Sequence, residues 1–365
     1  MTTTFAPWAS TDIEEIRAFN ARVSSSTYSF PTHASDLMEV GPPGSPLHHE
    51  LFVARVDGTV RGGYALKFES FCTPDARTQV ANLQIPLTEA LIDNRYAALG
   101  AAIPRDALSR CKYIYCLGMG VGRPLPKLLQ RLRWRMEYLP FYFRVVHTNR
   151  FLREIVFLRT RPQIALACDL ARYTGIGALA VGAWNALHPT RSADVRNGLK
   201  LECVDAFDDR ADELQLRVRR EYAGFCDRSG AALNQRFPMK DARLVRLYVN
   251  QGSQLIGWLV LSRNQLHRHK QFGSMKLGCI VDGLCRPTHA QALIACATQA
   301  LISYDVDLIV SNQSHRAWTN ALHKNGYVAG PSNFALGTSP ALTELAPALD
   351  TLHFNRGDGD GPINL

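Results

Sequence analysis

The chain has 365 residues, of which 46% are hydrophobic and 20% charged, and its formal net charge at pH 7 is +9. This length exceeds the roughly 250–300 residues at which a single hydrophobic core usually divides, so we expect two domains. The composition excludes an intrinsically disordered chain, and the positive charge favours anionic partners. Ten basic residues lie between Arg123 and Arg161, where Glu137 and Glu154 are the only acidic ones.

The N-terminus and the cysteines bear on the cellular compartment. Residues 1–10 contain neither a cationic start nor an apolar run, so we expect no signal peptide and a cytoplasmic protein. The nine cysteines are scattered, and none forms a CxxC pair. They are typical of reduced, mostly buried thiols, and we predict no metal site.

The apolar pattern of the first half predicts helices and strands. Asp57-Gly58 indicates a tight hairpin, because such turns need positive φ. The expected elements are a helix over 11–23, a polar loop over 24–49, hairpin strands over 51–55 and 61–68, a strand over 80–92, a helix over 98–109, a strand over 112–117, a glycine-rich bend over 118–122, a helix over 125–132 and an aromatic strand over 138–146.

The second half repeats this order with different residues. Its expected elements are a strand over 199–204, a helix over 211–222, hairpin strands over 244–249 and 255–261, a strand over 275–284, a helix over 290–303, a strand over 308–310, a helix over 316–324 and a return strand from 326. The repeated order indicates two similar domains, with one domain carrying a long insertion as the alternative. We place the domains at 1–155 and 198–345, a helical connector at 156–197, and a tail at 346–365, in which the stretch after Phe354 is expected to be disordered.

The connector contains an apolar segment over 164–187, which carries Asp169 and Arg172. A membrane-spanning helix needs about 20 predominantly apolar residues, and charges near its centre oppose insertion. We favour a helix packed between the two halves. A helix lying on a membrane surface and a true span remain open, and the neighbouring basic residues support the surface interpretation.

The segment from Leu91 to Gly100 resembles the pyrophosphate loop of the GNAT acetyltransferases, Gln/Arg-x-x-Gly-x-Gly/Ala, which follows a strand and opens a helix. Arg95 fills its first position and Gly100 its last, while Ala98 stands where glycine is usual. Gly326-Tyr327, and more weakly Arg133-Trp134, resemble the Gly-Phe that ends the last helix of that family. The order of elements matches the family over 1–155 and 198–345.

The resemblance implies an α/β (α+β) fold of two tandem GNAT-like domains, each a mixed, mostly antiparallel sheet flanked by helices. It also implies that acetyl-CoA or another acyl-CoA binds as co-substrate. Small side chains in the loop let backbone amides approach the CoA pyrophosphate at a helix N-terminus. The expected contacts are Leu91, Ile92, Asp93, Arg95, Tyr96, Ala97, Ala98, Leu99, Gly100 and Ala101. The second-half loop, 285–291, contains no glycine, so we expect the first half to hold the donor.

Three residues are candidates for the chemistry that the resemblance implies. Glu89 is the candidate general base, because apolar neighbours on its strand would raise its pKa; pairing with Arg95 or Arg105 is the alternative. Asp282 holds the comparable place in the second half. Tyr115, with Cys116 as a substitute, is the candidate acid for the leaving thiolate. A backbone amide near Leu91 or Ile92 would stabilise the oxyanion.

Four residues are expected to contact the acceptor. Asn234 and Arg236 lie in Leu233–Phe237, which is similar to a segment of the tandem GNAT proteins of bacterial polysaccharide clusters. Asn312 and His315 follow the last strand of the second half, where a cleft between the halves is expected.

The predicted function is transfer of an acetyl or longer acyl group from acyl-CoA to an amine of a small metabolite or amino sugar, in polysaccharide or secondary-metabolite biosynthesis. Two alternatives stay open. One is an aminoacyl-tRNA-dependent transferase similar to the Fem enzymes, the only case in which we expect nucleic acid to bind. The other is a non-catalytic acyl-CoA-binding or membrane-surface adaptor. The chain is expected to be a monomer or homodimer.

Overall fold

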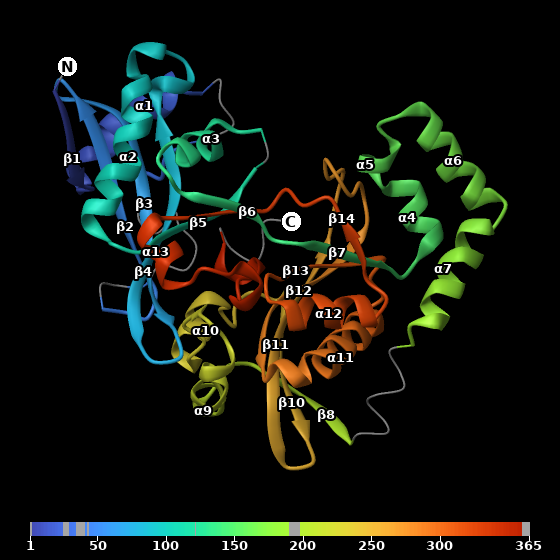
Figure 1. Ribbon diagram of the computed structural model, residues 1–365. Helices are drawn as coiled ribbons and strands as arrows, with labels where there is room; N and C mark the ends of the chain where they lie inside the picture. The colour runs from blue at the N-terminus through green and yellow to red at the C-terminus, as the bar shows by residue number, and fades with distance from the viewer. Residues whose placement is uncertain are drawn as a thin grey trace.

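The computed structural model describes residues 2–24, 29–33, 41, 44–120, 122–189 and 198–359. Within them the strands form two mixed sheets, one built mainly from each half of the chain. Helices lie against the sheets, and a separate group of helices stands at one side, on the right in Figure 1. Two mixed, mostly antiparallel sheets flanked by helices confirm the predicted fold class.

The first sheet has the order β1-β2-β3-β4-β5-β15-β6, and β9 also pairs with β3. Only β4 and β5 are parallel within it. The Asp57-Gly58 turn between β2 and β3 has the predicted positive φ angles, 48° and 82°. The strands are β1 (Thr3–Pro7), β2 (His48–Val56), β3 (Thr59–Cys72), β4 (Arg77–Thr88), β5 (Ile114–Met119), β6 (Arg135–Tyr138), β9 (Phe225–Cys226) and β15 (Ala335–Thr338).

The second sheet has the order β14-β7-β13-β12-β11-β10-β8. Again one pair, β12 and β13, is parallel. The strands are β7 (Phe141–Val145), β8 (Leu199–Val204), β10 (Leu244–Gln251), β11 (Gln254–Gln265), β12 (Lys276–Cys285), β13 (Leu308–Asn312) and β14 (Val328–Gly330). Read from β8 and from β1, the two sheets have the same order, with the parallel pair in the same place.

The two halves exchange a strand. β7 comes from the first half but lies in the second sheet, between β13 and β14, whereas β15 comes from the second half and lies between β5 and β6. The aromatic strand predicted over 138–146 is confirmed as β7, Phe141–Val145, but it belongs to the second sheet, and a separate strand, β6, precedes it. The chain leaves the first sheet after Tyr138, and Leu139-Pro140 separates the two strands, because proline has no amide hydrogen to continue a ladder. The domain boundaries placed from the sequence stay a prediction.

Helices connect the strands and cover the sheets. They are α1 (Ile13–Arg22), α2 (Ala97–Arg110), α3 (Pro124–Arg131), α4 (Thr148–Glu154), α5 (Val156–Arg159), α6 (Pro162–Tyr173), α7 (Ile176–Leu187), α9 (Asp209–Val218), α10 (Gly230–Arg236), α11 (Ala290–Ser303), α12 (Arg316–Lys324) and α13 (Pro340–Leu345). α2 and α11 make the crossovers that two parallel pairs require. α11 buries Leu293, Ala297 and Leu301, which recur at helical spacing.

No helix in the described part of the chain is by itself long and apolar enough to span a membrane. α6 and α7 together have the length and composition, but they are bent by 78° at the break between them.

The disorder predicted after Phe354 is wrong for residues 355–359, and residues 360–365 lie outside the described residues. Phe354 is fully buried and packs against Phe71 and Tyr115 of the first half, with ring centroids 6.0 and 5.2 Å apart. Asn355 and Asp358 are also fully buried. The glycines suggested disorder, but this segment fills the space between the two sheets, where its polar groups find partners.

Candidate functional site

The parallel strands β4 and β5 diverge near the centre of the molecule. Only two residue pairs join them, Ala81 with Ile114 and Asn82 with Tyr115. β4 then continues to Thr88, while its ladder with β5 ends at Asn82. A bulge interrupts β4 just beyond the divergence, at a residue with a left-handed backbone, Ile85 (φ 47°). Strands that separate in this way leave room between them, so the divergence is a candidate place for a polar, extended ligand.

The second sheet has the same divergence, but the chain itself occupies it. β12 and β13 pair from Leu277–Leu308 to Ile280–Ser311 and then separate. The segment 352–359 enters there: Asn355 bridges to Gln313, and the Arg356 guanidinium donates to the Asn312 side chain (2.7 Å). His353 donates through Nε2 to the Gly283 carbonyl oxygen (2.7 Å). An extended ligand would have to displace this segment from the second half.

The predicted phosphate loop precedes the N-terminus of α2, as expected, but many of its donors are already used. The amides of Ile92 and Asp93 donate to the Glu89 carbonyl oxygen, and that of Tyr96 donates to the Asp93 carbonyl oxygen. The expected oxyanion role is therefore not available to the Ile92 amide in this arrangement. The Asp93 carboxylate accepts from the amide and guanidinium of Arg95, whose hydrogen bonds lower the pKa of Asp93.

The remaining loop residues differ in exposure. Leu91 and Ile92 are exposed, as are Ala97 and Ala98 in the first turn of α2. Leu99 is buried, Ala101 is partly buried, and a Cβ on Gly100 would point toward Leu128 of α3 at 3.8 Å. Gly100 thus faces a neighbouring helix, and the exposed end of α2 is formed by the two alanines. Cofactor contacts along this loop stay a prediction.

Glu89 is buried at the end of β4 and lies between two guanidiniums. Its Oε1 accepts from Arg22 Nε and its Oε2 from Arg61 Nη1, the latter at 2.8 Å. The expectation of apolar surroundings is wrong, because β4 ends at Thr88 and Glu89 begins a 3-10 turn, Glu89–Leu91. Its partners are Arg22 and Arg61, not the predicted Arg95 or Arg105. A catalytic role for Glu89 stays a prediction.

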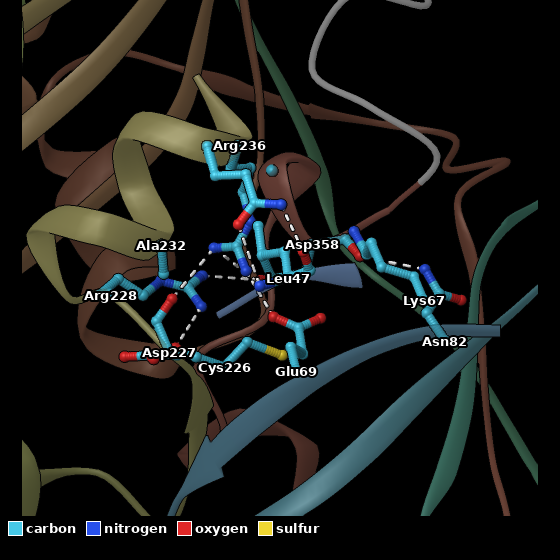
Figure 2. Close-up of polar contacts among 12 residues, drawn as sticks. Leu47, Lys67, Glu69, Asn82, Cys226, Asp227, Arg228, Ala232, Arg236 and Asp358 are labelled. Carbon is cyan, nitrogen blue, oxygen red and sulfur yellow. Dashed lines mark hydrogen bonds and ion pairs between the residues drawn. The ribbon is translucent and has the colours of Figure 1, made fainter. Parts of the chain in front are cut away.

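Tyr115 lies in a buried polar cluster between the two halves. Its hydroxyl donates to Glu69 Oε1 (2.5 Å) and to the Asp358 carbonyl oxygen (3.0 Å). The other oxygen of Glu69 accepts from Arg236 Nη2 (2.5 Å). Burial, together with Cys226 and Glu69, raises the pKa of Tyr115 well above its usual value, so the phenol is neutral at physiological pH. Figure 2 shows Glu69 facing Arg236 across the boundary between the halves.

Asp282 and Asp358 complete the cluster through Arg228. The Arg228 guanidinium contacts Asp282 Oδ1 at 3.3 Å and Asp358 Oδ2 at 2.8 Å, and Arg236 lies 3.9 Å from each carboxylate. Burial raises the pKa of Asp282. Burial would also raise the pKa of Asp358, but Arg228 and Arg236 outweigh it and lower that pKa. Asp282 is fully buried, and its predicted role as a base stays a prediction.

The side chains of Glu69, Cys226 and Asp358 bring one oxygen or sulfur atom each within 4.8 Å of the others. A divalent metal would prefer a thiolate and free carboxylates. Here burial raises the pKa of the Cys226 thiol well above its usual value, and both carboxylates already bind guanidiniums. Glu69 and Asp358 are therefore engaged by Arg236 and Arg228, and with a neutral thiol beside them these groups do not fit a metal.

A cavity of about 590 Å³ lies beside this cluster, between the first sheet and the N-termini of α9 and α10. Five of its lining residues are acidic, and the basic ones are Arg77 and His48. The acidic residues are Glu69, Asp208, Asp209, Asp212 and Asp227. Asp227 binds Arg77, and the Glu69 carboxylate is turned away toward Tyr115 and Arg236. Asp209, which is exposed, and Asp212 are accessible to a cationic ligand.

The predicted acceptor residues are divided between this region and other places. Arg236 joins Tyr115 and Asp282 in the central cluster, whereas Asn312 accepts a hydrogen bond from Arg356 of the C-terminal segment. Asn234 instead fixes the loop between β8 and α9, because its side chain exchanges two hydrogen bonds of 2.8 Å with the backbone of Phe207. His315 caps α12, and burial, helped by Arg316, lowers its pKa to about 4.

Sequence reasoning missed Lys67, Glu69, Arg228 and Asp358, together with the acidic cavity. One signal was present: Lys67 and Glu69 interrupt the apolar run of β3, and charges inside a buried strand indicate a polar partner. Asp358 lay in the segment predicted to be disordered. The pairing of Glu69 with Arg236 joins residues 167 positions apart, which no local pattern could reveal.

No protein-family model matches the chain, and no curated protein matches it. A GCN5-related N-acetyltransferase from Anabaena variabilis superimposes with a TM-score of 0.55 at 11% identity, covering 92% of this chain and 72% of that one. A probable N-acyltransferase from Enterococcus faecalis gives 0.54 at 7% identity, covering 94% and 74%. Saccharomyces cerevisiae N-myristoyltransferase with bound myristoyl-CoA gives 0.50 at 10% identity, covering 92% and 82%. The chain therefore has the fold of the GNAT N-acyltransferases. In this chain the fold consists of two sheets that exchange a strand.

Proposed function

We propose that this protein is an acyl-CoA-dependent N-acyltransferase that holds the donor in its first half. The observation that carries the proposal is the separation of β4 from β5 beyond Asn82, in a molecule whose second divergence is filled by its own chain. The pantetheine arm of CoA is extended and carries two amides, which can pair with a strand edge as an added strand does. An N-myristoyltransferase with the same fold binds myristoyl-CoA, which supports the proposal.

The phosphates of the donor are placed, in this proposal, at the exposed start of α2. Ala97 and Ala98 present small side chains there, and a helix N-terminus favours anions. The net charge of +9 also favours an anionic co-substrate.

The acceptor is proposed to be an amine that enters the acidic cavity between the halves. Its volume, about 590 Å³, suits a small metabolite, and its carboxylates attract a protonated amine. In the reaction, the neutral amine attacks the thioester carbonyl carbon and the C–S bond breaks. The amine proton passes to a carboxylate or to water, and the CoA thiolate leaves with the electron pair of the bond.

Among the predicted catalytic residues, the proposal keeps Tyr115 for proton transfer to the leaving thiolate. Tyr115 is in the last residue pair before the divergence, and its hydroxyl contacts Glu69, which borders the acidic cavity. Glu89 and Asp282 are held by arginines and do not border this cavity. Replacing Tyr115 by Phe removes only the hydroxyl, and we expect kcat to fall at least tenfold with KM for the donor unchanged.

Matched charge variants test the location of the donor. Ala98→Glu places a carboxylate in the first turn of α2. The positive potential at the helix N-terminus favours a negative charge there, so the helix should stay intact, but the new carboxylate should repel the CoA phosphates. Gln291→Glu makes the same change at the corresponding position of α11. Calorimetric titration with acetyl-CoA and longer acyl-CoAs is expected to show saturable binding that Ala98→Glu weakens at least tenfold and Gln291→Glu leaves unchanged. Equal effects of the two variants, or no binding of any CoA thioester, would contradict the proposal.

The acceptor is tested by the release of free CoA thiol with a panel of amines. Asp209→Asn, which removes an exposed charge of the cavity, is expected to raise KM for the amine severalfold with kcat nearly unchanged. Asp205→Asn removes a nearby exposed charge that does not line the cavity, and serves as the control. Donor binding without thiol release for any amine would instead support a non-catalytic acyl-CoA-binding protein.

A further inference from the structure

The helical arm, residues 148–187 with helices α4–α7, has an unusually apolar outer surface. Figure 1 shows α6 and α7 at the outer edge of the molecule, on the side opposite the first sheet. Leu179 and Leu187 of α7 are 74% and 76% exposed. The other exposed large apolar residues of the arm are Val156, Phe157, Ile164, Leu166, Leu170, Tyr173, Ile176 and Trp184. Contiguous exposed apolar surface of this kind marks an interaction site.

α7 lacks the exposed polar side chains expected of a surface helix. Its inward side contains Val181, which packs against the core of the second half, and Asn185, which donates to the Val145 carbonyl oxygen. The exposed residues of α7 are all apolar: Ile176, Ala178, Leu179, Ala180, Gly182, Ala183, Trp184, Ala186 and Leu187. An ordinary surface helix places its charged and polar side chains outward. The outer face of α7 is therefore suited to an apolar environment and not to water.

The outer face of α6 continues this surface. Leu166, Leu170 and Tyr173 recur at spacings of three and four residues and are all exposed. The charged side chains of α6 are held against the arm itself: Asp169 pairs with Arg159, and Arg172 donates to the Asn149 side chain. The apolar stripe is thus free of competing charge.

A basic cavity of about 470 Å³ adjoins the base of the arm, where α5 meets the loop 268–274. It is lined by Arg153, Arg159, Arg268, His269 and Lys270, with Glu154 as its acidic member. Glu154 is bound by Arg153 and the Ser274 amide. Within the described residues, neither Arg268 nor Lys270 has a carboxylate within 4 Å. Val156 lines this cavity and is itself exposed, so the basic and apolar surfaces are contiguous.

We propose that the helical arm binds the surface of an anionic lipid bilayer. The apolar faces of α6 and α7 enter the boundary between headgroups and acyl chains, and the basic cavity receives anionic headgroups. Each helix has 12 residues and is about 18 Å long, which is shorter than the hydrocarbon core of about 30 Å. The 78° bend at Gly175 also favours lying on the surface over crossing it. Tyr173 and Trp184 are of the type enriched at membrane interfaces.

Vesicle co-sedimentation of the full-length protein tests this proposal. The probes are phosphatidylcholine vesicles with and without 30% phosphatidylserine (about the level that gives a strongly anionic surface). We expect the protein to partition to the anionic vesicles and to dissociate as salt is raised. Leu179→Ser with Leu187→Ser is expected to lower the partition coefficient at least tenfold, and so is Arg268→Glu with Lys270→Glu. Leu216→Ser on α9, a position 71% exposed on another surface, is the matched control and should bind as the wild type does.

Three results would overturn the proposal. The first is no binding of the wild type to either vesicle, and the second is unchanged binding of the double serine variant. The third is a wild-type dimer that the double serine variant converts to a monomer without any vesicle binding, which would make this surface a contact between copies of the chain. Circular dichroism and thermal unfolding should show that all variants remain folded, since the substituted side chains are exposed.

Discussion

At the scale of single residues, the centre of the molecule is held by ion pairs that are out of contact with water. Glu69 and Arg236 are both fully buried in their side chains and come from different halves. Glu89 is also buried, but its partners Arg22 and Arg61 are about one third and one quarter exposed. Two buried glutamates thus have different surroundings, and their replacement should have different consequences.

Glu69→Gln is expected to destabilise the protein by about 3–5 kcal/mol, because it leaves Arg236 buried with carboxylates no closer than 3.9 Å. Glu89→Gln makes the same chemical change and should cost less, since Arg22 and Arg61 can regain water. Urea unfolding of the two variants and the wild type measures the difference. Equal losses, or an unchanged midpoint for Glu69→Gln, would show that the central pair is not required for stability.

His353 makes stability depend on pH. Burial, reinforced by Arg228, lowers its pKa to about 3, so it is neutral in the folded state at neutral pH. The unfolded chain, with a histidine pKa near 6.5, binds the proton first as pH falls. Between about pH 6.5 and pH 3 the unfolded state therefore carries more protons, and stability rises with pH.

We expect the free energy of unfolding to decrease as pH is lowered from 7 to 4. In the His353→Gln variant this decrease should be less steep, because the difference in bound protons between the unfolded and folded states falls by about one. Glutamine retains a donor for the Gly283 carbonyl oxygen. Denaturant unfolding at a series of pH values gives both slopes. If the two slopes coincide, His353 does not titrate in the way that its burial requires.

At the scale of elements, the segment 352–359 determines how the two strand divergences differ, although its glycines suggested a disordered tail. It fills the divergence of β12 and β13, and it contacts the base of the divergence of β4 and β5. Because of this one segment, the two similar sheets offer different sites: residues 352–359 fill one divergence, whereas at the other they contact its base. The asymmetry on which the proposed donor site rests is therefore a property of the C-terminal chain.

Phe354→Ala tests the packing of this segment. Phe354 is fully buried against Phe71 and Tyr115, so its truncation is expected to cost about 3–5 kcal/mol. Phe157→Ala is the matched control, because that side chain is 51% exposed and should cost little. A Phe354→Ala variant as stable as the control, by urea unfolding, would mean that the segment behaves as the tail that its glycines suggested.

At the scale of the whole molecule, the strand exchange joins the halves into one structure. The first sheet lacks an inner strand without β15, and the second lacks one without β7. Buried backbone groups on both sides of each missing strand would then have no partners, which is costly. The two halves should therefore depend on each other for folding.

We expect a single calorimetric unfolding transition, with equal calorimetric and van't Hoff enthalpies. Fragment 1–189 carries β7 of the second sheet, and fragment 198–365 carries β9 and β15 of the first. The two fragments should fold only when they are expressed together. Two resolved transitions in the whole chain, or a fragment that folds alone with native-like circular dichroism, would indicate independent domains.

The sequence by itself determined the α/β class, the repeated order of elements and the Asp57-Gly58 hairpin, because these follow from local periodicity and turn chemistry. Even the start of α2 after β4 was predictable from Leu91–Gly100. Only the tertiary structure decided that Glu69 meets Arg236, that the strand predicted over 138–146 joins the second sheet, and that the C-terminal segment fills one of two similar divergences. Those features depend on contacts between residues far apart in the chain, where neither periodicity nor local composition carries information.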